Sequence, residues 1–301
     1  MIKKISKLTM ITLLMGSILL MGAVGCQSQL SPQDKGKFDD WRVDWNGYNP
    51  DVYPPQTGEG QLPEINDPND ERQEGEVSPS EGIPATNPAT YTAMIKSATN
   101  SLNVRSAPST GGQVLGTLDK GDMVRYEGLQ NGWYKTVYKQ KTAYIYAGND
   151  YASVVYMKQG NDKVEKVISV GEELLGYPYV WGSQRYHWGN GKLNTSFVQG
   201  QFDCSALMQY VFYKGAGVLM DLNTRTQVLQ GEKVNLADLQ RGDVMFFTND
   251  SRYGYSGVER VGHVALYLGD NYILHTASDH AVIEEISAKR WSYFIVAKRF
   301  I

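Results

Sequence analysis

Cys204 is the residue whose chemistry stands out most clearly in the sequence. It follows Asp203, a residue type that commonly caps the start of a helix, and apolar residues come after it at helical spacing. A thiol in the first turn of a helix lies at the positive end of the helix dipole, which favours the ionised, nucleophilic form. A small buried hydrophobic residue is the alternative, but the polar neighbours Asp203 and Ser205 argue against it. We therefore predict that Cys204 is a nucleophile at the start of a helix.

A nucleophilic thiol needs a base, and two of the four histidines stand where strands can bring them together. His263 begins an apolar run, and His275 ends the next one. A three-residue turn over 269–271 would pair Leu268 with Tyr272, and that register puts both imidazoles on the same face of a strand pair. We predict that His263 takes the thiol proton and that His275 fixes its tautomer.

Zinc binding is an alternative use of the same side chains. With Cys204 as a third ligand, His263 and His275 could hold a metal ion. No cluster of Cys, Asp or Glu at metal-ligand spacing completes such a site in the sequence. We therefore predict neither a metal nor a cofactor. His187 and His280 lie among residues typical of loops, and we assign them no chemical role.

A β-rich segment at 91–157 precedes the residues with this chemistry. Its short alternating runs are separated by Gly and Asn-Gly turns, which predicts a small barrel. The Leu-Asn-Val-Arg run at 102–105 and the Gly-Trp-Tyr-Lys-Thr-Val run at 132–137 resemble the bacterial SH3-type domain. That resemblance implies a recognition module for peptidoglycan or a wall of the neighbouring active site. A structural spacer is the alternative.

Residues 162–301 carry four motifs that resemble those of the NlpC-type cell-wall cysteine peptidases. The motifs are Pro-Tyr-Val-Trp-Gly at 178–182, Phe-Asp-Cys-Ser-Ala-Leu at 202–207, Leu-Gln-Arg-Gly-Asp-Val-Met-Phe-Phe at 239–247 and Gly-His-Val-Ala-Leu-Tyr-Leu-Gly at 262–269. The resemblance implies an α+β, papain-like fold, in which helices bearing the cysteine pack on an antiparallel sheet bearing the histidines. It also implies hydrolysis of peptidoglycan stem peptides, typically between γ-D-glutamyl and the following diamino acid.

The same resemblance implies roles for individual residues. By position, Cys204 is the nucleophile, His263 the base and His275 the orienting residue. Tyr179 falls where a tyrosine beside the thiol helps to stabilise the oxyanion. The residues that flank the cysteine, Asp203 and Ser205, would bind the amino end of the substrate.

Two stretches depart from the family pattern. The segment 184–201 is longer than usual and would overhang the cleft. The segment 223–227 matches only loosely, with Gln227 where a serine often lies. The preference for free stem peptides over the intact wall therefore stays open.

The first 26 residues predict export and lipid anchoring. Three lysines lie within 1–7, an apolar run follows, and small residues precede Cys26, which is the pattern of a secretory signal. The cysteine at this place resembles the bacterial lipobox, whose acylated thiol becomes the new N-terminus. A plain signal peptide or an N-terminal anchor helix is the alternative. We expect the protein on the outer face of the bacterial cell membrane, held in the bilayer through acylated Cys26.

Residues 27–90 predict a disordered, acidic, Pro-rich tether. They contain nine of the eleven prolines and 13 acidic against 4 basic side chains, a composition that cannot bury enough apolar surface to fold. Residues 91–301 carry 22 basic and 19 acidic side chains. This weak positive balance lacks the dense Lys/Arg patch of nucleic-acid-binding proteins, so we expect no nucleic-acid partner.

Three classes of function fit these observations. We favour a lipid-anchored peptidoglycan endopeptidase that forms an acyl-enzyme on Cys204. A cell-wall amidase or acyltransferase would use the same thiol. A wall-binding lipoprotein with an inactive site is the non-enzymatic alternative, and the intact Cys204, His263 and His275 argue against it.

Overall fold

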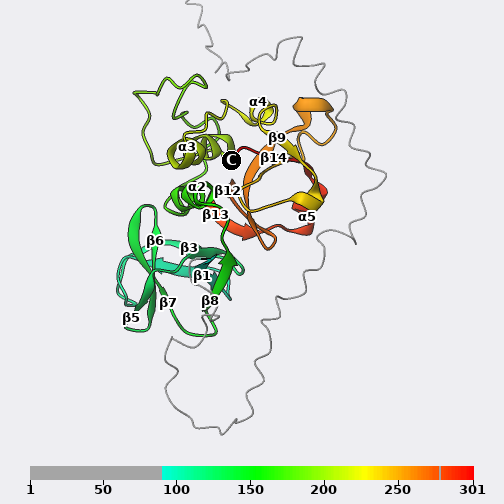
Figure 1. The fold of residues 1–301 in the computed structure, drawn as a ribbon. Helices are drawn as coiled ribbons and strands as arrows, with labels where there is room; N and C mark the ends of the chain where they lie inside the picture. Colours follow the sequence, from blue (N-terminus) through cyan, green and yellow to red (C-terminus); the bar gives the residue numbers. More distant parts are fainter. Residues whose placement is uncertain (1–89, 278) are drawn as a thin grey trace, which may run out of the picture.

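The computed structural model describes residues 90–277 and 279–301 (Figure 1). The predicted signal peptide, Cys26 and the predicted tether up to residue 89 lie outside these residues. No helix in the described part of the chain is long and apolar enough to cross a membrane.

The first half of the described chain is built from strands alone. These are β1 (Tyr91–Ser97), β2 (Leu102–Arg105), β3 (Val114–Leu118), β4 (Met123–Arg125), β5 (Gly128–Gln130), β6 (Trp133–Tyr138), β7 (Lys141–Tyr146) and β8 (Ala152–Lys158). They form a three-stranded sheet of order β4-β1-β8 and a five-stranded sheet of order β3-β2-β7-β6-β5. The sequence pattern predicts about five of them and misses β5 and the pair β1 and β8, which are hydrogen-bonded to each other along their whole length.

The second half combines helices with one antiparallel sheet of order β13-β12-β11-β10-β14-β9. The helices are α2 (Asp162–Glu172), α3 (Cys204–Ala216), α4 (Thr224–Gln227), η4 (Leu236–Asp238), η5 (Gly257–Arg260) and α5 (Ala288–Ser292). The strands are β9 (Glu232–Val234), β10 (Val244–Phe247), β11 (His263–Gly269), β12 (Tyr272–Ala277), β13 (His280–Glu285) and β14 (Phe294–Arg299). This arrangement is the predicted α+β, papain-like fold, with a small all-β barrel in front of it.

Helix α3 begins at the residue that the sequence predicts. The Asp203 side chain caps it by accepting a hydrogen bond from the Ala206 backbone N–H at 2.8 Å. Helices α2 and α3 lie side by side next to the sheet (Figure 1). The inner face of α3 packs on β11 and β12 through fully buried side chains such as Leu207, Val264 and Leu274. The start of α3 is thereby held against the strands that carry the two histidines.

Strands β11 and β12 form a hairpin with the predicted register over most of its length. Leu266 lies opposite Leu274, as expected. Near the turn the register shifts, and Gly269, not Leu268, lies opposite Tyr272. The predicted three-residue turn is therefore wrong in detail. The turn contains two residues, 270 and 271, and the extra residue, Leu268, lies in a bulge of β11. The register that places the histidines is unaffected.

The barrel and the second half of the chain share one continuous hydrophobic core. The β6–β7 turn also meets the segment that follows α2, where the Lys139 backbone N–H donates to the Leu175 carbonyl at 2.9 Å. An ion pair joins Arg125 of β4 to the buried Glu172 of α2 at 3.4 Å. The barrel is thus docked on the helices by apolar packing, backbone hydrogen bonds and a charged pair.

Candidate active site

The Cys204 thiol lies against the first residues of β11. Cys204 is the first residue of α3, is a free cysteine and is 8% exposed. The backbone N–H groups of Val264 and Ser205 lie close enough to its sulfur to lower the pKa of the thiol. Because Val264 directly follows His263, this contact brings the thiol next to the predicted base.

The thiol is neutral at rest. Burial raises the pKa of Cys204 to about 12, and the negative charge of Asp203 acts in the same direction. The Val264 and Ser205 N–H groups and the Arg185 cation lower this pKa, but by less. The direction is opposite to the one that the helix dipole alone predicts, because loss of hydration disfavours the thiolate more strongly.

The two predicted histidines are in direct contact. Nε2 of His263 lies 2.8 Å from Nδ1 of His275, and the ring centroids are 5.0 Å apart. Burial, the neighbouring His275 and Arg290 hold the pKa of His263 well below its usual value. Thiol and base are therefore both uncharged before a substrate arrives, so the proton must move as the sulfur attacks.

A carboxylate and a guanidinium extend this chain of contacts. Nε2 of the fully buried His275 lies 2.9 Å from Oε1 of Glu284, which also receives a hydrogen bond from Nη2 of Arg290 at 3.1 Å. Neither residue belongs to the motifs that the sequence shows. Glu284 could have been found from the β12–β13 register, since it lies opposite Ile273 and so shares a sheet face with His275.

Tyr179 lies beside the thiol. Its backbone forms an isolated parallel bridge with Phe202, two residues before Cys204. Burial raises the pKa of Tyr179 to about 12, and the nearby Cys204 and Asp203 act in the same direction. Its hydroxyl is therefore protonated and can donate a hydrogen bond to an oxyanion that forms near the sulfur.

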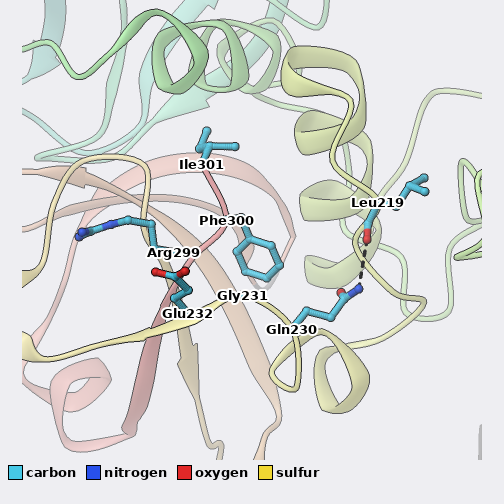
Figure 2. A pocket seen from close by; sticks show the side chains of 7 residues that line it. All are labelled: Leu219, Gln230, Gly231, Glu232, Arg299, Phe300 and Ile301. Atoms are coloured by element: carbon cyan, nitrogen blue, oxygen red, sulfur yellow. Dashed lines mark hydrogen bonds between the residues drawn. The ribbon is translucent and has the colours of Figure 1, made fainter.

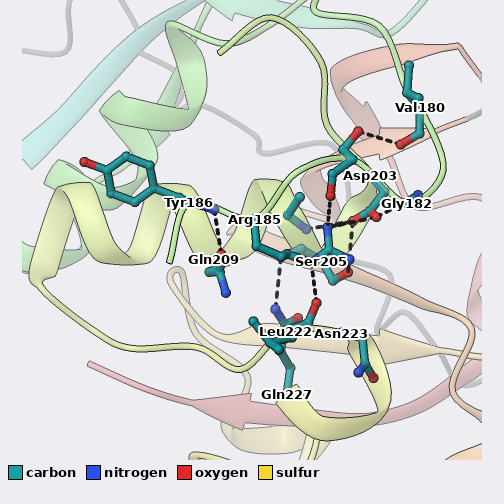
Figure 3. A network of polar contacts seen from close by, with 12 residues as sticks. Val180, Gly182, Arg185, Tyr186, Asp203, Ser205, Gln209, Leu222, Asn223 and Gln227 are labelled. Atoms are coloured by element: carbon teal, nitrogen blue, oxygen red, sulfur yellow. Dashed lines mark hydrogen bonds and ion pairs between the residues drawn. The ribbon is translucent and has the colours of Figure 1, made fainter. Parts of the chain in front are cut away.

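Asp203 and Ser205 belong to a polar network centred on Arg185 (Figure 3). Nη1 of Arg185 lies 3.0 and 2.9 Å from the two carboxylate oxygens of Asp203, and Nη2 lies 3.2 Å from Oγ of Ser205. The Arg185 side chain also donates to the Leu222 carbonyl. No sequence pattern predicts a role for Arg185, because it lies in the irregular segment 184–201, where no periodicity indicates a contact.

Gln227 ties the loosely matching segment to the same network. Its side-chain amide donates to the carbonyls of Ser205 at 2.9 Å and Asp221 at 2.8 Å, and the residue is fully buried. Nearby, the Gln209 side chain accepts from the Tyr186 backbone N–H at 2.9 Å. The segment that follows Arg185 is thus anchored to α3 from the inside.

A pocket lies instead at the C-terminal residues (Figure 2). This cavity of about 510 Å³ is lined by Leu219, Gln230, Gly231, Glu232, Arg299, Phe300 and Ile301. None of the predicted site residues lines it. Among residues 90–277 and 279–301, no group of three His, Cys, Asp or Glu side chains is arranged to hold a metal ion.

Two family models match the chain. Residues 176–299 match the NlpC/P60 family, and residues 100–151 match the bacterial SH3 domain. The matches coincide with the α+β half and with most of the barrel.

Curated relatives include two peptidoglycan endopeptidases and a dipeptidyl-peptidase. Peptidoglycan endopeptidase RipA from Mycolicibacterium smegmatis is 32% identical over 38% of this chain and 21% of its own length. Peptidoglycan DL-endopeptidase CwlO from Bacillus licheniformis is 27% identical over 47% and 29%. A gamma-D-glutamyl-L-lysine dipeptidyl-peptidase from Bacillus cereus is 29% identical over 46% and 36%. The chain therefore spans only about a fifth to a third of the length of these relatives.

Proposed function

We propose that this protein is a cysteine endopeptidase that hydrolyses the stem peptides of peptidoglycan. The observation that carries the proposal is the contact of the Cys204 sulfur with the strand that begins at His263, together with the 2.8 Å pair of His263 and His275. The similarity to peptidoglycan endopeptidases supports the class of substrate.

The reaction proceeds through an acyl-enzyme on sulfur. His263 takes the proton from the Cys204 thiol while the sulfur attacks the carbonyl carbon of the scissile peptide bond. The Tyr179 hydroxyl donates to the oxygen that becomes negative. His263 then gives its proton to the departing amine. A water molecule, deprotonated by His263, hydrolyses the thioester and restores the thiol.

The proposed bond lies between γ-D-glutamyl and the following diamino acid. Its support is the similarity to a gamma-D-glutamyl-L-lysine dipeptidyl-peptidase. Asp203 and Ser205 would meet the substrate together with Arg185, which already balances the carboxylate charge. Stem peptides with an acylated amino end are therefore expected to be accepted as well as free ones.

Digestion of defined stem peptides tests the proposal. The wild-type protein, Cys204→Ala and the control Cys26→Ser are incubated with stems that carry a free or an N-acetylated L-Ala, and the products are identified by mass spectrometry. We expect cleavage after γ-D-Glu by the wild type and the control only. Equal product from Cys204→Ala would refute the thiol mechanism. Product masses of an amidase or a transfer reaction would refute the assigned bond.

We further propose that the protein is exported and anchored in the bacterial cell membrane through acylated Cys26. The support is the sequence pattern of residues 1–26. Incorporation of labelled palmitate into the wild type but not into Cys26→Ser tests the anchor. Equal labelling of the two proteins would refute it.

A further inference from the structure

The outer end of the histidine pair is held by two charged residues that the sequence motifs do not include. Glu284 of β13 lies 2.9 Å from Nε2 of His275, and Arg290 of α5 lies 3.1 Å from the same carboxylate oxygen. His275 has no exposed surface. Three strands and a helix thus contribute to one chain of hydrogen bonds that begins at His263.

The ionisation state of Glu284 determines which atoms donate and which accept in this chain of hydrogen bonds. Burial alone would raise the pKa of Glu284, but the hydrogen bond from His275 and the charge of Arg290 bring it below its usual value. An ionised carboxylate only accepts hydrogen bonds, so Nε2 of His275 carries a hydrogen and its Nδ1 must be the acceptor. Nε2 of His263 therefore carries a hydrogen as well. Nδ1 is left as the basic nitrogen of His263.

We propose that Glu284 is a positioning residue for the base, which fixes the tautomers of both histidines and stabilises the imidazolium that forms on His263. The carboxylate does not receive the proton: the proton moves from sulfur to Nδ1 of His263, and the other hydrogens stay in place. Arg290 keeps Glu284 ionised and in position. The inference rests on the proposed pairing of Cys204 with His263, but not on peptidoglycan as the substrate.

Other charged groups near this chain do not replace Glu284. His280 of β13 acts on His275 as a further positive charge, and Arg290 disfavours a second positive charge on either histidine. Asp122, in the turn before β4, interacts with Glu284 from the barrel side. Among these groups, Glu284 is the carboxylate that is hydrogen-bonded to the relay.

Alkylation of Cys204 by iodoacetamide tests the proposal without any substrate. The full-length wild type, Glu284→Gln, Glu284→Ala and the control Glu285→Gln are labelled between pH 5 and 10, and the peptide that contains Cys204 is followed by mass spectrometry. Free cysteine, alkylated under the same conditions, serves as the reference. The control removes the same charge from the adjacent, exposed residue.

We expect alkylation of Cys204 at pH 7 to slow about 10- to 100-fold in Glu284→Ala, by analogy with the cost of removing the outer hydrogen-bond partner of a metal-ligating histidine. The inflection that follows the ionisation of His263 should move downward, because the imidazolium on His263 is less stabilised without the carboxylate. Glu284→Gln keeps an oxygen that accepts from both donors, so it should fold and show an intermediate loss. A wild-type rate and pH profile in both variants would overturn the proposal.

Stem-peptide hydrolysis separates this proposal from the proposed function. If the substrate assignment is right, Glu284→Gln should lower kcat and leave KM unchanged, because Glu284 does not contact the substrate. If the wild type hydrolyses no stem peptide but alkylation still depends on Glu284, the positioning role stands and the substrate assignment fails. If both Glu284 variants are alkylated and hydrolyse stem peptides at the wild-type rates, the proposed function stands and the positioning role of Glu284 is refuted.

Discussion

Removal of the Arg185 guanidinium should cost far more stability than the loss of an ordinary surface charge. In the wild type this group lies 2.9 Å from the Asp203 carboxylate, and the two side chains are only 15% and 7% exposed. It also lies 3.2 Å from the Ser205 hydroxyl and donates to the Leu222 carbonyl. Arg185→Met fills much of the same volume with an apolar chain and leaves the Asp203 charge buried without its cation.

The size of the effect follows from what remains around Asp203. Breaking a buried ion pair by removing one partner typically costs about 3–5 kcal/mol. Asp203 keeps hydrogen bonds from the Ala206 and Gly182 N–H groups and from the Ser205 hydroxyl, at 2.8, 3.1 and 2.9 Å. These donors compensate part of the loss, so we expect about 3 kcal/mol. Combining Arg185→Met with Asp203→Asn should recover part of it, because no buried charge is then left.

Urea unfolding of the full-length protein at pH 7 measures this cost. The matched control is Arg252→Met, since Arg252 pairs with Glu259 at 3.3 Å with side chains that are 27% and 58% exposed. We expect less than about 1 kcal/mol for the control. Alkylation of Cys204 should also slow in Arg185→Met, because the Arg185 cation lowers the thiol pKa. Equal unfolding free energies for the two variants would refute the reasoning.

Two further predictions concern the contact between the barrel and the helices. Burial raises the pKa of Glu172 from 4.5 to about 7 despite Arg125. The contribution of this group to the free energy of unfolding is therefore fully present below about pH 4.5, and it is lost as the pH rises through 7. Between pH 4.5 and 8, urea unfolding should therefore show Glu172→Gln gaining about 3 kcal/mol relative to the wild type; parallel pH profiles would contradict this. Gly176 and Gly182 have φ of +86° and +74°, but only at Gly176 would a Cβ meet another residue, Tyr138, at 2.2 Å. Gly176→Ala should cost about 1–3 kcal/mol more than Gly182→Ala in thermal or urea unfolding, and equal costs would count against a tight contact.

The start of α3 and the histidine pair could be predicted because local patterns determine them. An N-cap residue before a helical apolar period locates the first turn, and the two-residue period of strands determines which side chains share a face. The prediction for His263 and His275 depended on the parity of the hairpin register alone. The bulge near Gly269 changed the length of the turn but left the register of Leu266 and Leu274 as predicted.

Arg185 and Glu284 could not be predicted in the same way. Arg185 lies in a segment without periodicity, and the site residues that it meets, Asp203 and Ser205, are 18 and 20 residues away in the sequence. Glu284 meets His275 only through the register of a second hairpin. The ionisation of Cys204 was predicted in the wrong direction, because the sequence shows the helix start but not that the thiol would be 8% exposed.

The barrel lies close enough to the site to influence the outer end of the histidine relay. Strand β4 packs against β13, the strand that carries Glu284. Asp122, directly before β4, is itself buried; burial raises its pKa to about 6, and the negative charge of Glu284 adds to the shift. The carboxylate of Glu284 thus disfavours the ionisation of Asp122, which couples the start of β4 to the outer end of the relay. This contact argues against the interpretation of the barrel as a spacer without influence on the relay.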